Sequence, residues 1–172
     1  MEQDRPEPLS IYGKSKLAGE GWVVGMGDKG LIIRTAWLYG KNGKNYIDTI
    51  LNKLELGIDV SITNDQVGCP TYTIDLANAV IKLATNYKSG IFNVVNSGYC
   101  TWYNFAVHAA KLMNYDVKHL KIITTEDLQR KAKRPKYCVL SLNRLERTLP
   151  DKMRHWKDAL NQYLIETEKL HA

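Results

Sequence analysis

The alternation of apolar and polar positions along the chain predicts helices separated by short buried strands. Apolar residues return at helical spacing over 11–24, 47–56 and 74–87, whereas 30–40 is an apolar run that begins and ends with glycine, as a buried parallel strand does. This order of elements indicates an α/β protein. Further strands are expected at 59–63, 91–96 and 121–128, the last running into a turn, and further helices at 101–113 and 153–168.

The same pattern predicts one compact unit over residues 1–172, or a piece of one, because no internal repeat, low-complexity tract or long linker divides it. Residues 64–73 (NDQVGCPTYT) are typical of a turn-rich loop with a structural role. A doubly wound fold normally begins with a strand and a glycine-rich turn. Here the pattern begins with a helix.

One segment matches the sequence pattern of a dinucleotide-binding motif but not its expected structural context. Residues 25–30 read G-M-G-D-K-G, which fits G-x-G-x-x-G. That turn must follow a strand and open a helix, so that backbone N–H groups face a pyrophosphate. This segment follows a helix and precedes a strand, and we interpret it as a helix-terminating loop.

Length and composition favour an ordinary globular protein. The 172 residues are 44% hydrophobic, and no run approaches the roughly 18 to 20 apolar residues of a membrane span. Because the start also lacks the apolar centre of a signal peptide, we expect a cytoplasmic protein. Cys69, Cys100 and Cys138 lack metal-ligand spacing and are expected to be reduced, packed thiols.

The net charge of +6 is compatible with a solvated surface or with an anionic small substrate. Basic residues are densest at 118–121 and 130–136, without interleaved aromatic residues. Nucleic acid is therefore not expected as a partner.

Tyr12 and Lys16 are the first residues that indicate chemistry. They stand four positions apart on a predicted helix, so their side chains lie side by side. An ammonium beside a phenol stabilises the phenolate, which lets the tyrosine exchange a proton with a substrate oxygen. A tyrosine and a lysine at this spacing are more often a simple surface contact, so the pair alone is weak evidence.

Five segments taken together resemble the dTDP-4-dehydrorhamnose reductases, and they occur in the order seen in that family. The resemblance spans nearly the whole chain and separates it from the more distant UDP-sugar epimerases. The segments are YGKSKLAGE (12–20), RTAWLYG (34–40), NDQVGCPTYTIDLA (64–77), SGYCTWYNFA (97–106) and KRP (133–135).

The resemblance implies hydride transfer from NADPH to the C4 ketone of a dTDP-linked 6-deoxy-hexulose. Tyr12 would protonate the new alkoxide, and Lys16 would bind the nicotinamide ribose and stabilise the phenolate. The family also implies that Trp37 contacts the sugar and that Asn45 and Tyr46 bind substrate. Arg134 would bind the diphosphate, because a guanidinium matches phosphate geometry, although a solvated loop charge explains it about as well.

The implied fold is the C-terminal portion of an extended Rossmann-type, short-chain dehydrogenase fold, with its N-terminal βαβ units missing. Residues 1–42 and 71–97 would form a remnant of the dinucleotide-binding sheet and helices, and 43–70 and 98–172 a small substrate-binding lobe. Since the family's phosphate-binding turn and catalytic threonine or serine lie upstream, we expect little activity from this chain alone. An exposed sheet edge would favour self-association or a homodimer.

Two other interpretations stay open. A non-catalytic binding subunit would keep the fold without the reaction, as the regulatory subunit of methionine adenosyltransferase does. An epimerase would retain its nicotinamide cofactor and need no external reductant. Magnesium is left undecided, because no carboxylate cluster in the sequence requires it.

Overall fold

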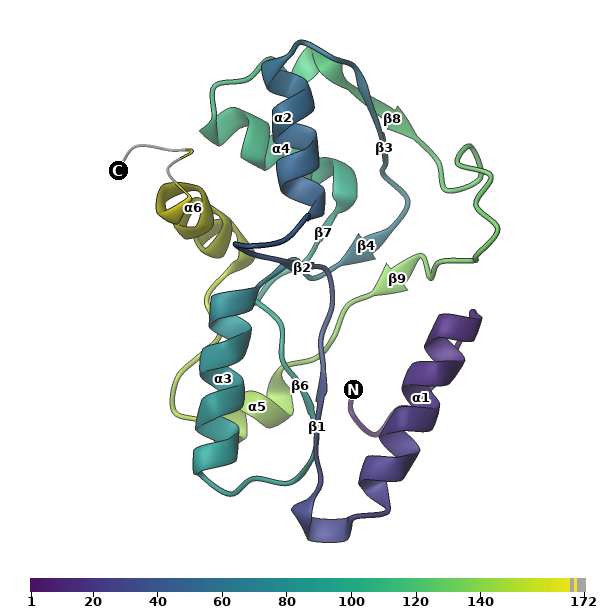
Figure 1. Cartoon of the computed structure of the whole chain (residues 1–172), viewed down its shortest axis with the longest axis vertical. Coiled ribbons are helices and arrows are strands. Elements are labelled where there is room, and N and C mark those ends of the chain that lie inside the picture. Colours follow the sequence, from purple (N-terminus) through teal and green to yellow (C-terminus); the bar gives the residue numbers. More distant parts are fainter. Residues whose placement is uncertain (168, 170–172) are drawn as a thin grey trace.

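A computed structural model describes residues 1–167 and 169. Helices and strands alternate, and most of the paired strands run parallel (Figure 1). The helices are α1 (Ile11–Val24), α2 (Tyr46–Glu55), α3 (Thr73–Thr85), α4 (Trp102–Leu112), α5 (Asn143–Thr148) and α6 (Trp156–Glu166). The strands are β1 (Leu31–Arg34), β2 (Leu38–Tyr39), β3 (Val60–Thr63), β4 (Val67–Gly68), β5 (Thr71–Tyr72), β6 (Gly90–Asn93), β7 (Cys100–Thr101), β8 (Leu120–Ile123) and β9 (Tyr137–Cys138).

The lower part of the molecule in Figure 1 is built around the parallel pair β1 and β6, with α1 and α3 on opposite sides of it. Leu83 of α3 is fully buried and packs with Phe92 of β6. Leu145 of α5 joins the same cluster from much later in the chain. Burying these side chains is the main force that holds α3 and α5 against the sheet.

The upper part is built around a second parallel pair, β3 and β8, covered by α2 and α4. Ile50 of α2, Ile62 of β3 and Ala106 of α4 meet in its core. Short strands lie between the two parts: β2 pairs with β5, and β4 lies between an antiparallel β7 and a parallel β9.

Helix α6 packs at this junction against an aromatic cluster. Tyr163 is fully buried beside Tyr39 and Tyr72, and its hydroxyl donates to Asp48 on α2 at 2.7 Å. The Tyr72 hydroxyl donates to Glu166 at 2.6 Å. Polar contacts at both ends of a packed aromatic cluster therefore fix α6 to α2 in the upper part and to β5 at the junction.

Several expectations from the sequence are confirmed. The helix at 11–24 is found as predicted, and Ser10 caps it by accepting from the Gly13 N–H at 3.1 Å. Residues 25–30 do connect a helix to a strand, with a short 3-10 turn at Gly27–Lys29. The α/β class is confirmed as well.

Other expectations were wrong in detail. Residues 64–73 are more than a loop, because β4 and β5 form there and Gly68 to Tyr72 are buried. The last helix begins at Trp156 rather than at 153, where His155 caps it, and residue 168 lies outside the described residues. Helix α5 was not predicted. The division into 1–42 with 71–97 and 43–70 with 98–172 stays a proposal. Helix α5 comes from the second of these groups but packs on the lower part of the molecule.

Candidate active site

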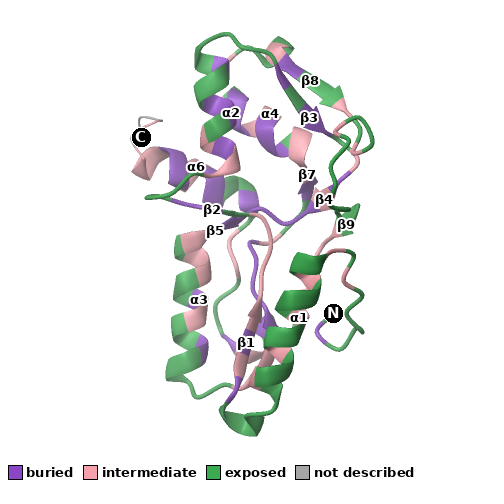
Figure 2. Cartoon of the chain, turned by 45° about the vertical axis from the view of Figure 1, so that its right-hand side comes forward, coloured by how far each residue is buried: buried purple, intermediate pink, exposed green. Residues whose placement is uncertain are grey.

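Helix α1 presents Tyr12 and Lys16 on one exposed face. The Tyr12 side chain is 65% exposed, and the Lys16 ammonium lies 5.5 Å from the centroid of its ring. None of the residues of α1 is buried, and Figure 2 shows the helix mostly in the exposed colour. The phenol and the ammonium are therefore neighbours and are open to a ligand.

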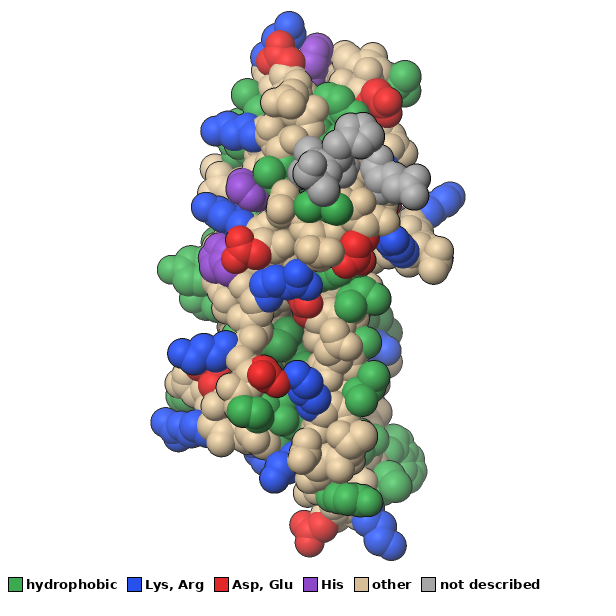
Figure 3. All heavy atoms as spheres, turned by 90° about the vertical axis from the view of Figure 1, so that its left-hand side faces the viewer, with side chains coloured by type: hydrophobic (Ala, Val, Ile, Leu, Met, Phe, Trp, Pro, Cys, Tyr) green, Lys and Arg blue, Asp and Glu red, His purple; other side chains and the backbone are tan. Residues whose placement is uncertain are grey.

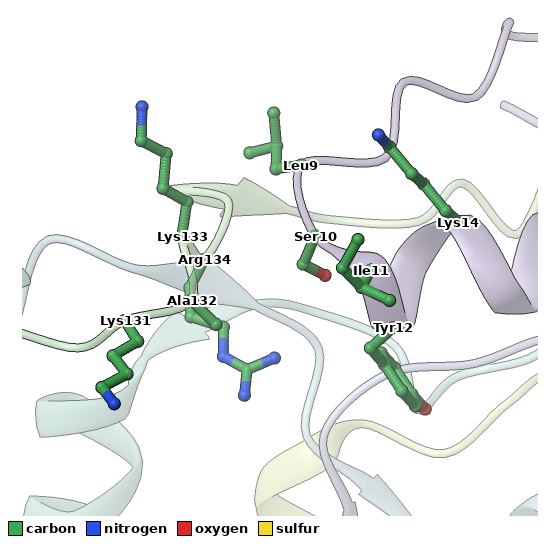
Figure 4. A pocket seen from close by; sticks show the side chains of 9 residues that line it. All are labelled: Leu9, Ser10, Ile11, Tyr12, Lys14, Lys131, Ala132, Lys133 and Arg134. Carbon is green, nitrogen blue, oxygen red and sulfur yellow. The ribbon is translucent and has the colours of Figure 1, made fainter.

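A cleft of about 870 Å³ lies between the start of α1 and the loop that precedes β9. Figure 4 shows the Tyr12 ring on α1 and the Arg134 side chain on the facing loop, both extending toward the lower part of the view. Lys14, Lys131 and Lys133 also line the cleft, and no acidic residue is among its lining residues. The cleft thus offers a positively charged wall opposite a phenol, which suits an anionic substrate.

Trp37 follows β1 and has an unusual backbone conformation, with φ at 46°. Its indole stacks on Trp102 of α4, with the ring centroids 3.6 Å apart and the planes 10° from parallel. Gly68 of β4 approaches the same indole so closely that a Cβ there would lie 2.5 Å from its Cε2 atom. Part of the indole surface is therefore already used by the fold, which leaves only the remainder of the ring for a sugar.

Tyr46 meets the same tryptophan pair from α2. Its ring centroid is 4.2 Å from that of Trp102, and both rings line a small cavity of about 120 Å³ together with Gln66 and Arg130. Burial raises the pKa of Tyr46 while the positive charge of Arg130 opposes the rise, so this phenol stays protonated at neutral pH. Trp37 and Tyr46 are thus brought together, with Trp102 between them.

The Asn45 side chain forms hydrogen bonds with other residues of the fold. As the N-cap of α2 it accepts from the Asp48 N–H at 3.0 Å. Its amide nitrogen lies within hydrogen-bond distance of the Gly40 carbonyl, Asp48 and the Tyr163 hydroxyl, at 2.9 to 3.1 Å. These contacts position the first turn of α2.

The structure therefore gathers the predicted residues into two groups. In the first group, Tyr12 and Arg134 line one cleft and Lys16 lies beside Tyr12. In the second group, Trp37 and Tyr46 both pack against Trp102. Sequence reasoning gave no role to Trp102, although a tryptophan directly after the Thr101 helix cap was a signal that could have been used.

In residues 1–167 and 169 no group of three or more His, Cys, Asp or Glu side chains is arranged to hold a metal ion. Over the same part of the chain no helix has both the length and the apolar character needed to cross a bilayer.

Parallel strand pairs between helices, with the helix of Tyr12 and Lys16 beside the first strand, define an α/β protein. A family model for the RmlD substrate binding domain matches residues 1–169, and the chain belongs to this family.

Relatives with high similarity agree with this assignment. The spore coat polysaccharide biosynthesis protein SpsK of Bacillus subtilis (strain 168) is 42% identical over 165 residues, which cover 96% of this chain and 57% of that protein. The crystal structure of a dTDP-4-dehydrorhamnose reductase ortholog from Clostridium acetobutylicum ATCC 824 has a TM-score of 0.91 and 42% identity over 97% of this chain and 59% of its own. The dTDP-4-dehydrorhamnose reductase of Bacillus anthracis str. Ames, solved in complex with NADP, has a TM-score of 0.91 and 36% identity over 96% and 58%. This chain spans a little more than half the length of these relatives.

Proposed function

We propose that the chain is the substrate-binding portion of an NADPH-dependent reductase in nucleotide-sugar and polysaccharide biosynthesis. The reaction is reduction of the C4 ketone of dTDP-4-dehydro-6-deoxy-L-mannose to dTDP-L-rhamnose. The observation that carries the proposal is the cleft that Tyr12 and Arg134 line together, with Lys16 one turn further along α1. The similarity to two solved dTDP-4-dehydrorhamnose reductases supports it. We place this reaction in the cytoplasm.

Tyr12 is the proton donor in this proposal. As C4 is reduced, the ketone oxygen becomes an alkoxide, and the Tyr12 hydroxyl donates its proton to that oxygen. The Lys16 ammonium then stabilises the phenolate that remains, since it lies 5.5 Å from the ring centroid. Exposure of the phenol leaves it accessible to a sugar carbonyl.

The surface of α1 beside Tyr12 and Lys16 is open. The same side of α1 continues at Gly19, where an added Cβ would meet no atom within 4 Å. We assign Lys16 to the hydroxyls of a nicotinamide ribose bound there. When bound, NADPH supplies the hydride.

Arg134 binds the diphosphate of the substrate from the facing loop, helped by the positive charge of Lys131 and Lys133. Trp37 and Tyr46 bind on the sugar side through the ring surfaces that Trp102 leaves open. Asn45 supports this wall indirectly, because its hydrogen bonds fix the turn that carries Tyr46.

Calorimetric titration of dTDP into the purified chain tests the substrate assignment. Loss of a guanidinium bound to phosphate removes roughly 1.5 to 3 kcal/mol, so Arg134→Ala should weaken binding about 10- to 100-fold. Lys53→Gln is the matched control, since Lys53 is an exposed cation in the last turn of α2. Equal affinity of wild type and Arg134→Ala would refute the diphosphate assignment.

The role of Tyr12 requires a turnover assay, measured as NADPH oxidation by a protein that combines this sequence with the dinucleotide-binding portion of its relatives. Removing a general acid lowers the rate by about 10²- to 10⁴-fold, and Tyr12→Phe should do so while dTDP affinity is unchanged. NADPH oxidation that depends on the keto-sugar nucleotide excludes both a non-catalytic subunit and an epimerase. Full activity of Tyr12→Phe would exclude Tyr12 as the proton donor.

A further inference from the structure

A second cavity of about 520 Å³ lies between α4 and the start of α6. It shares no lining residue with the cleft at Tyr12 and Arg134. Figure 3 shows histidine side chains, with lysine, arginine and some acidic side chains near them, along one edge of the face that α6 occupies. None of the roles assigned above uses this cavity.

Four basic side chains from two helices line the cavity. His108 and Lys111 stand three positions apart on α4, and His155 and Lys157 stand at the start of α6. No acidic residue is among the lining residues. The cluster is held around the buried Trp156, whose ring centroid is 5.3 Å from that of His108, 5.7 Å from that of His155 and 5.7 Å from the Lys157 ammonium.

The hydrogen bonds of the helix start orient one of these groups. His155 Nδ1 accepts from the Lys157 N–H at 3.2 Å, so its Nε2 atom carries the ring proton and is a donor. The Trp156 N–H is bonded to the Ser97 carbonyl at 3.0 Å. These two backbone donors are in use, and the positive character of the cavity therefore comes from side chains.

The pKa of His108 reflects the basic side chains that line the cavity with it. The pKa of His108 is lowered, first by burial and then by electrostatic interactions with Lys157, His155 and Lys111. Asp158 acts in the opposite direction as a smaller effect. An anion in the cavity would compensate this excess of positive charge.

We propose that this cavity binds the phosphate group of a small phosphorylated molecule, at a site separate from the reductase cleft. Lys111 and Lys157 supply the charge, and His108 and His155 supply ring N–H donors. Trp156, Val107 and the 62% exposed Tyr99 form an apolar wall for the organic part of the ligand. The volume lies within the range of about 300 to 1,000 Å³ that is usual for small-molecule sites.

Histidine side-chain NMR provides the test, because the lining residues of the Tyr12 cleft include no histidine. Inorganic phosphate is titrated into the chain first, and thymidine monophosphate is titrated separately. We expect the His108 and His155 signals to move in a saturable way and the pKa of His108 to rise. Tighter binding of the nucleotide identifies a nucleotide site, and equal binding identifies a site for phosphate itself.

Two lysine variants and one control make the result specific. Lys111→Gln and Lys157→Gln should each weaken phosphate binding by about 3- to 10-fold, as expected for the loss of one nearby charge. Both lysines are exposed, so these variants should fold, and an unchanged amide spectrum verifies it. Lys53→Gln on α2 removes the same charge elsewhere and should bind like wild type. Absence of saturable shifts at His108 and His155, or an equal loss in Lys53→Gln, would overturn the proposal.

Discussion

At the scale of single residues, the backbone of Trp37 is the least ordinary feature of the site. A φ of 46° lies in the left-handed region, which few residues other than glycine adopt and which costs on the order of 1 to 3 kcal/mol. Stacking on Trp102 and close contact with Gly68 offset this cost. The indole is thus positioned in advance, so that a substrate does not have to order it.

Gly68→Ala should displace the Trp37 indole, because the new methyl group would lie 2.5 Å from Cε2. We expect a loss of roughly 1 to 3 kcal/mol in unfolding free energy, as for other overpacked sites, and a smaller near-ultraviolet circular dichroism signal from the stacked tryptophans. Gly43→Ala is the control, since a Cβ there meets nothing within 4 Å. A near-ultraviolet spectrum that is the same in Gly68→Ala and wild type would show that Gly68 does not position the indole.

Residue contacts could be predicted where they are local. Tyr12 and Lys16 are neighbours because helix geometry joins positions four apart, and the sequence shows that spacing directly. The stack of Trp37 on Trp102 joins segments on different elements, and no spacing encodes it. The capping role of Asn45 could have been inferred from asparagine just before the apolar pattern at 47–56.

At the scale of elements, α6 depends on a hydrogen bond to the β5 tyrosine. The Tyr72 hydroxyl donates to Glu166 at 2.6 Å, and this bond, together with one from Gln162, lowers the pKa of Glu166. Because the carboxyl pKa in the folded state lies below its unfolded value, its contribution to stability is present above the unfolded pKa of about 4.5. It is lost as the pH falls through the folded pKa.

Tyr72→Phe should therefore lower the unfolding free energy by about 1 kcal/mol at pH 7, and the difference from wild type should shrink as the pH falls below about 4.5. Urea denaturation at a series of pH values measures it. Tyr87→Phe is the control, because Tyr87 is 95% exposed. A difference that stays constant down to acidic pH would exclude ionised Glu166 as the acceptor that matters.

The long helices and the four-residue strands were predictable, since each extends over enough residues to show a period. The apolar run 30–40, predicted as one strand, contains both β1 and β2. The sequence could not show β4, β5, β7 and β9, because a strand of two residues has no period and exists only through its partner. Helix α5, with six residues, is equally short and depends on Leu145 packing against β6.

At the scale of the whole molecule, α1 leaves large apolar side chains exposed to solvent. Ile11 is 79% exposed and Trp22 is 84% exposed, and they lie three turns apart on one face of the helix. We expect the chain to self-associate through this face at high concentration. Trp22→Asp should shift sedimentation velocity profiles toward monomer, whereas Leu56→Asp at the end of α2, where Leu56 is 74% exposed, should not. A wild-type chain that sediments as a monomer at all concentrations would contradict this expectation.

The strand pairing also determines how the chain can reach its native state. Leu31 pairs with Gly90 and Val60 pairs with Leu120, so neither main ladder can form as a local hairpin. Long stretches of chain must close into loops before the strands can form their stabilising contacts. The entropy lost in closing these loops raises the free-energy barrier to folding. Refolding should therefore be slow for a protein of this size, on the order of milliseconds to seconds. During that time the unpaired strands are open to association with other chains, so this topology also makes the unfolded chain prone to aggregation.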